Sequence, residues 1–139
     1  MRFAILVTVY MQYTLGKEEK LKSKKLIEQL FAEGDYVKAF PFRLIYLPIN
    51  HGAEFPIKVG FSVPKRNVKL AVNRNRIKRL MREVYRKNKH FFAENLKEPY
   101  IFMFIYMAKE EINYVDLELS LKKVALKFHS KIKEDDKKN

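Results

Sequence analysis

The sequence predicts a single α+β domain, and three observations carry that prediction. Its 139 residues fit one domain, and a hydrophobic fraction of 47% is enough for a buried core. Apolar residues alternate with other residues along 55–63, as in a strand with one buried face. They recur at helical spacing in the stretches that begin at Ser23, Ala71 and Asn113. We therefore expect helix, two or three strands, helix, strand and helix within residues 13–132.

The two ends of the chain are predicted to lie outside this domain. Residues 1–12 contain the apolar run RFAILVTVYM, which is much shorter than the roughly 20 residues of a membrane span. The run also lacks the small-residue cleavage site of a signal peptide. It is either an extra edge strand or an extension upstream of a true start at Met11, and we favour the extension. Residues 133–139 are predicted to be a disordered tail.

The first half of the domain is predicted to hold one helix and two strands. The helix spans 23–33, its first serine is a plausible N-cap, and Gly34 ends it. A strand over 40–47 follows, and the loop at 48–54 is expected to close a hairpin to the strand at 55–63. On the other face of the strand at 55–63, Gly60 and Ser62 have small side chains. Either another backbone or a helix could therefore pack closely against that face.

The second half is predicted to hold a helix, a strand and a final helix. Pro64 ends the preceding strand, and a loop over 65–70 leads into a helix from about Ala71 to Lys89. The run YIFMFIYM at 100–107 is apolar on both faces, which is typical of a central strand covered by helices. Stacking of bases on its aromatic residues is a second interpretation, and core packing is the one we favour. Asn113 is positioned to cap the final helix.

The chain is strongly basic, with a formal net charge of +13 and a sequence pI near 9.8. This charge predicts a strongly anionic partner, with nucleic acid first and an acidic membrane surface second. There is no cysteine, which excludes disulfides and thiolate metal sites and fits a reducing cytosol.

The positive charge is concentrated in residues 65–89, where Glu83 is the single acid. In a helix, the apolar residues of this stretch form one stripe. The opposite side then holds Asn75, Lys78, Arg79, Arg82, Arg86 and Lys89, with Arg74 and Arg76 at its two borders. Like charges at i, i+4, such as Lys78 and Arg82, are mildly destabilising. The pattern therefore favours phosphate recognition over a merely solvated helix face.

This stretch resembles a known family. VGFSVPKR followed by AVNRNRIKRLMREVYR is similar to the protein subunit of bacterial ribonuclease P, whose signature is a strand, a Lys/Arg pair and an R-N-R-x-K-R helix. Residues 74–79 match that signature as they stand, and weaker similarity extends over 21–128. The resemblance implies a two-layer fold with a central, mostly antiparallel four-stranded sheet and about three helices. It also implies a left-handed strand–helix–strand crossover, against the usual right-handed rule.

The resemblance further implies two RNA-binding surfaces. The first, on the basic helix, lies against the catalytic RNA subunit and comprises Arg74, Asn75, Arg76, Lys78, Arg79, Arg82 and Arg86. The second is a cleft between the opening helix and the sheet that receives the single-stranded 5′ leader of precursor tRNA. It comprises Ile27, Phe31, Tyr46, Lys58, Lys65 and Arg66. The family usually has an aromatic residue at the position of Ile27, so apolar contact with a base is expected there. The loop at 65–70 carries an extra Asn67 relative to some members.

The resemblance implies a cytoplasmic, basic cofactor of a catalytic RNA, and together they remove the 5′ leader from precursor tRNA. Mg²⁺ would be held mainly by the RNA subunit and the substrate. The chain's own acids are scattered, and His51, His90 and His129 fall in different predicted elements, so we expect neither catalytic residues nor a metal site. The alternatives are a general RNA-binding or ribosome-associated module and a free-standing endonuclease. Membrane and DNA partners are not expected.

Overall fold

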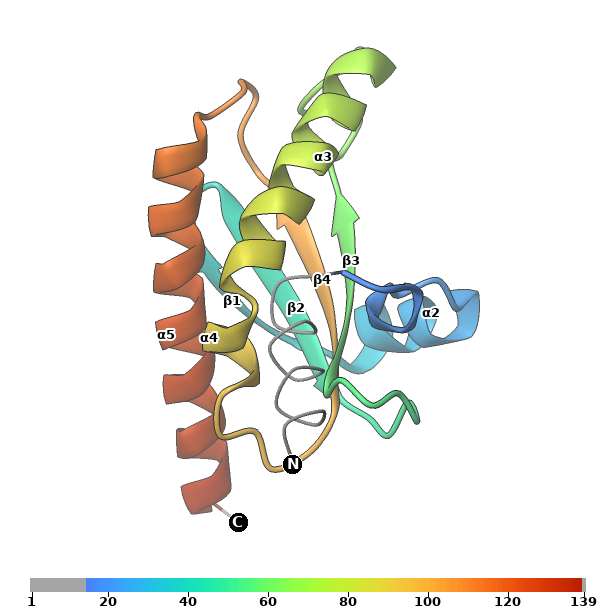
Figure 1. The fold of residues 1–139 in the computed structure, drawn as a ribbon, viewed down its shortest axis with the longest axis vertical. Coiled ribbons are helices and arrows are strands. Elements are labelled where there is room, and N and C mark those ends of the chain that lie inside the picture. Colours follow the sequence, from blue (N-terminus) through green and yellow to red (C-terminus); the bar gives the residue numbers. More distant parts are fainter. Residues whose placement is uncertain (1–14, 139) are drawn as a thin grey trace, which may run out of the picture.

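The structure, a computed structural model, describes residues 15–138 and shows one mixed four-stranded sheet with helices on both faces (Figure 1). The predicted α+β class is confirmed. In chain order the elements are η1 (Lys17–Glu19), α2 (Lys24–Glu33), β1 (Asp35–Ala39), β2 (Phe42–Pro48), β3 (Ile57–Ser62), α3 (Ala71–Asn88), α4 (His90–Ala93), β4 (Tyr100–Tyr106) and α5 (Tyr114–Lys138). The predictions for residues 1–12 lie outside the described residues.

The strands are ordered β1-β2-β4-β3, which corrects the predicted pairing. No hairpin joins β2 to β3, because β2 pairs with β1 and β4 while β3 lies on the far side of β4. The reason is the composition of β4, which is apolar on both faces and so takes an interior position with a neighbour on each edge. The hairpin partner of β2 is instead β1, a short edge strand that the sequence pattern did not reveal.

Parallel pairing between β3 and β4 requires the chain to cross one face of the sheet, and α3 with α4 makes that crossing. The predicted strand–helix–strand unit is therefore confirmed, and its left hand stays a prediction. The crossing places α3 beside α5, and both helices lie over the same face of the sheet (Figure 1).

Each face of the sheet has its own core. Under α3 and α5, the core includes the aromatic row of β4 that the alternation predicted: Tyr100, Phe102, Phe104 and Tyr106. All four are buried, so core packing is their role. The opposite face of β4 supplies Ile101 and Met103 to a smaller core under α2, which contributes Leu30. The sheet is therefore covered completely on one face and by one short helix on the other.

The buried stripe of α3 consists of Ile77, Met81, Val84 and Tyr85, as predicted. The N-cap residue of α3 is Leu70, whose side chain cannot accept a hydrogen bond from the first-turn N–H groups as a capping serine or aspartate would. Instead, Nη1 of Arg74 donates to the carbonyl oxygens of Val68 and Lys69, at 3.0 and 2.6 Å. One arginine thereby ties the preceding loop to the first turn.

Lys89 does not lie on the exposed basic side of α3, where the helical pattern places it. The regular helix ends at Asn88, and Lys89 is completely buried against Glu19 and the ring of Phe55, whose centroid is 4.5 Å from Nζ. The second carboxylate oxygen of Glu19 accepts a hydrogen bond from the N–H of Gly16 at 2.9 Å. Burial lowers the pKa of Lys89, and the hydrogen bond to Glu19 opposes that shift.

The predicted tail is helical, because α5 continues to Lys138 and so includes residues 133–138. Two contacts just before this segment explain the extension. Ile132 packs against the larger core, and Nζ of Lys131 contacts Oδ1 of Asp35 at 2.6 Å, which joins α5 to the start of β1. No helix of the described residues has the length and apolarity needed to cross a membrane.

The buried pair makes a stability prediction. Lys89→Ala leaves the Glu19 carboxylate buried without its partner, so we expect it to lower the free energy of unfolding by about 3–5 kcal/mol. Lys87→Ala is the matched control, because Lys87 is half-exposed and its Nζ lies 3.8 Å from Glu83, a surface pair worth about 1 kcal/mol or less. Urea unfolding measures both variants.

The double variant Glu19→Leu, Lys89→Met tests whether the missing partner causes the loss. Replacing both charges with apolar groups should recover most of the lost stability. Equal unfolding midpoints for Lys89→Ala and Lys87→Ala would contradict the assignment.

Candidate nucleic-acid interface

The solvent side of α3 carries a row of cations without internal counter-charges. Within residues 15–138, no ion pair or side-chain hydrogen bond engages Lys78, Arg79 or Arg82. Arg79 and Arg82 are exposed, and Lys78 is half-buried. The first turn of the helix contains no acid, so its backbone N–H groups add to the positive potential. This surface suits an extended polyanion.

Two other predicted residues of this surface have partners within the chain. Arg76 lies 3.4 Å from Glu111, and 65% of its side chain remains exposed. Arg86 pairs with Glu83 at 2.5 Å, and the hydrogen bond between them raises the pKa of Arg86 and lowers the pKa of Glu83. Pairs this exposed contribute about 0–1 kcal/mol, so phosphate competes for the same guanidinium groups. The acids therefore leave most of the cationic surface open.

The two remaining predicted residues of the helix differ in role: Asn75 is exposed to solvent, whereas Arg74 holds the preceding loop. Asn75 is exposed on the same side as Arg79. Arg74 is half-buried, and its guanidinium is engaged by the loop carbonyls described above. Arg74 thus positions the start of the basic helix in addition to carrying charge.

A second candidate surface lies on the face of the sheet that α2 covers. On α2, Ile27 is half-buried in the smaller core and Phe31 is 52% exposed. Lys58 of β3 lies on this same face, two residues from Gly60, where an added Cβ would lie 2.8 Å from Met103. Lys65 and Arg66 are exposed in the loop that follows β3. The structure thus places α2 and Lys58 on the same face of the sheet, α2 over β2 and β4 and Lys58 on the neighbouring strand β3, with the two loop cations beyond the end of that strand.

Tyr46 was assigned to this surface and lies on the opposite face. Its ring centroid is 5.0 Å from that of Phe128 of α5, and its side chain is buried in the larger core. The neighbouring β2 residue, Ile45, faces α2 and packs against the smaller core, as Ile27 does. Successive residues of a strand point to opposite faces, so an alignment displaced by one position exchanges the two.

Two residues on this side of the sheet were not among the predicted site residues. The guanidinium carbon of Arg43 lies 4.3 Å from the ring centroid of Tyr36, and Tyr36 is 43% exposed. Nζ of Lys131 on α5 lies 5.4 Å from the same ring centroid, so Tyr36 is a partly exposed ring with two cations beside it at the edge of the sheet. The parity of β2 gives a signal for Arg43, which alternates with the buried Leu44. Tyr36 had no signal, because it belongs to the unpredicted β1.

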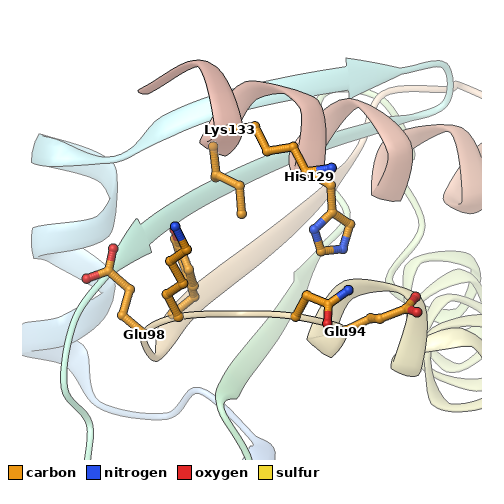
Figure 2. A pocket seen from close by; sticks show the side chains of 8 residues that line it. Glu94, Glu98, His129 and Lys133 are labelled. Atoms are coloured by element: carbon orange, nitrogen blue, oxygen red, sulfur yellow. The ribbon is translucent and has the colours of Figure 1, made fainter. Parts of the chain in front are cut away.

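The titratable groups that a nuclease would use are dispersed in the described part of the chain. No three His, Asp or Glu side chains of residues 15–138 lie together as metal ligands. His51 and His129 each contact a backbone oxygen, that of Pro56 at 3.0 Å and that of Phe91 at 2.6 Å. A cavity of about 420 Å³ lies between α5 and the segment that leads into β4, with Glu94 and Glu98 opposite His129 and Lys133 (Figure 2). It is remote from the exposed row of α3.

Comparison with known proteins identifies the family. The chain matches the family model described as Ribonuclease P over residues 15–129. The ribonuclease P protein component of Porphyromonas gingivalis is 31% identical over 131 residues, which cover 91% of this chain and 95% of that protein. The corresponding component of Clostridium botulinum is 34% identical over 106 residues, 76% of this chain and 89% of that protein.

Solved structures agree on the fold. The RNase P protein of Staphylococcus aureus matches with a TM-score of 0.63 and 23% identity, over 80% of this chain and 94% of that one. The RNase P protein of Thermotoga maritima matches with a TM-score of 0.62 and 20% identity, over 77% and 94%. Together with the sequence matches, these likenesses establish that the chain belongs to the ribonuclease P protein family.

Proposed function

We propose that the chain binds the catalytic RNA subunit of ribonuclease P through α3 and the 5′ leader of precursor tRNA through the α2 side of the sheet. As a family member, the chain is a protein component of an endoribonuclease complex that processes tRNA. The observation that carries the proposal is the row of half-buried Lys78 and exposed Arg79 and Arg82, whose side chains have no counter-charge within residues 15–138. A folded RNA supplies that counter-charge.

The protein's share of the reaction is binding, and the chemistry is assigned to RNA. The described carboxylates do not fit a metal site, because no three ligands converge. We therefore assign Mg²⁺ to the RNA subunit and the substrate. The cationic surface of α3 would reduce repulsion between phosphates that the folded RNA brings together, and so favour its metal-loaded form. The cytoplasm is the expected compartment.

The α2 side of the sheet would supply leader affinity. Phe31 and Tyr36 offer exposed rings, Ile27 and Ile45 an apolar floor, and basic residues adjoin them on β3 and the following loop. Aromatic rings with nearby cations bind single strands with little sequence preference, because every base has a face that stacks. This surface is separate from the row on α3, so one small protein can contact two RNAs.

Reconstitution with the organism's own RNA subunit tests the proposal. At low Mg²⁺, cleavage of precursor tRNA should require both the RNA and this chain. Cleavage by the chain alone would indicate a free-standing endonuclease. Equal cleavage with and without the chain would indicate a general RNA-binding or ribosome-associated module instead.

The exposed row of α3 predicts a change in salt dependence. Arg79→Ala should weaken binding to the RNA subunit and reduce the slope of log K against log salt by about 0.9, the value for one lost phosphate contact. Filter binding between about 50 and 200 mM salt measures the slope. Lys123→Ala, at an exposed lysine of α5, is the control and should change neither quantity. A slope unaffected by Arg79→Ala would mean that this guanidinium does not contact phosphate.

The leader surface predicts a selective loss of affinity. Phe31→Ala should weaken binding of precursor tRNA to the reconstituted complex by about fivefold or more, since stacking on one base is worth about 1–3 kcal/mol. Binding of mature tRNA, which has no leader, should not change. Phe40→Ala is the matched control, because Phe40 is an even more exposed phenylalanine in the β1–β2 turn. Equal losses for precursor and mature tRNA would place Phe31 outside the leader surface.

A further inference from the structure

The outer edge of β1 is covered by side chains of α5. β1 lies at the edge of the sheet, so every second residue directs its backbone N–H and C=O away from β2. Three successive outward carbonyl oxygens, two in β1 and one in the turn that follows, accept hydrogen bonds from α5: those of Tyr36, Lys38 and Phe40. The respective donors are Nζ of Lys131 at 2.8 Å, Nζ of Lys127 at 2.7 Å and Oγ of Ser120 at 2.8 Å. One helix therefore occupies the carbonyl groups with which another strand would pair.

The start of this edge is closed by a further pair of contacts. The N–H of Tyr36 donates to Oδ1 of Asp35 at 2.8 Å, and Nζ of Lys131 contacts the same oxygen at 2.6 Å. Lys131 thus bonds both a carboxylate and a backbone carbonyl of β1. Its neighbour in this role, Lys127, stands four residues earlier in α5, so both ammonium groups extend from one side of the helix.

The sequence at this edge is well suited to pairing with a second copy of itself. The stretch from Tyr36 to Phe40 is nearly symmetrical about Lys38, with an aliphatic residue on each side and then an aromatic one. In an antiparallel pair of two copies centred on Lys38, Tyr36 of each copy would lie opposite Phe40 of the other. Both rings are available, since Tyr36 is 43% exposed and Phe40 is 70% exposed. Cross-strand aromatic pairs of this kind stabilise a sheet.

We propose that α5 shields β1 from strand addition by a second copy of this chain, through the side chains of Ser120, Lys127 and Lys131. Lysine suits this role, because its ammonium group bonds a carbonyl oxygen and is costly to bury between two strands. The opposite edge of the sheet is covered by backbone instead, since the N–H of Leu21 donates to the carbonyl of Val59 in β3 at 2.9 Å. The cover on β1 consists of side chains, so substitutions can remove it.

The test uses the full chain without RNA, so its result does not depend on the proposed function. Sedimentation equilibrium of the original chain should give a mass near 16.7 kDa from micromolar to millimolar concentration. Lys127→Ala combined with Lys131→Ala should give a mass that rises with concentration towards twice that value. The control, Lys123→Ala combined with Lys133→Ala, removes the same charge from two exposed positions of α5 and should keep the mass of the original chain.

Two further measurements separate shielding from a general effect on stability. Lys127→Arg combined with Lys131→Arg keeps both donors and both charges, so this variant should remain a monomer. In the alanine double variant, hydrogen exchange at the outward amide of Lys38 should become slower as the protein concentration rises, because pairing occupies that N–H. Lysines that merely stabilise β1 would, when removed, make this exchange faster at every concentration.

The proposal is overturned if the alanine double variant keeps the mass of the original chain, or if the control associates to the same extent. It is also overturned if the original chain associates through β1, or if association protects another strand and not β1. Urea unfolding shows whether the double variant is folded. If it is not, Ser120→Ala combined with Lys127→Ala frees the carbonyls of Phe40 and Lys38, and the same outcomes decide.

Discussion

The parallel contact between β3 and β4 is the constraint on which the rest of the structure depends. It obliges the chain between them to cross the sheet, and α3 makes that crossing with an apolar stripe against the core and a basic side toward solvent. Burial of Ile77, Met81 and Val84 stabilises by about 1.5–3 kcal/mol per side chain. Like charges at i, i+4 cost only a few tenths of a kcal/mol per pair. The core can therefore hold a helix whose outer side is strongly cationic.

Features set by local periodicity were predictable from the sequence. The apolar character of both faces of β4 indicated an interior strand, and the strand has a neighbour on each edge. The spacing of Ile77, Met81 and Val84 indicated the buried side of α3, which also fixed the direction in which Arg79 and Arg82 point. These predictions held because each depends on residues within about two turns of one another or within one strand.

Features set by distant partners were not predictable in the same way. Val37 is the one buried residue of β1. The strand therefore forms mainly because it pairs with β2, and its own sequence gives little indication of it. Lys89 follows the helical pattern of an exposed residue, yet Glu19, which is 70 positions earlier, holds it in the interior. Tyr46 illustrates a different failure. The alternation of β2 placed it on the face opposite Arg43, and the assignment to the leader surface that the family resemblance implied overrode that information.

Opposite charges are separated along this small protein. The basic row lies along α3, whereas Glu33, Asp35, Glu98 and Asp135 line a pocket near the end of α5. That end of α5 lies at the opposite end of the molecule from the start of α3 (Figure 1). With 18 residues, α3 extends over about 27 Å. The Debye length at physiological salt is about 8 Å, so solvent screens the start of α3 from the carboxylates near the end of α5. These acids therefore leave the attraction between the start of α3 and phosphate almost unchanged.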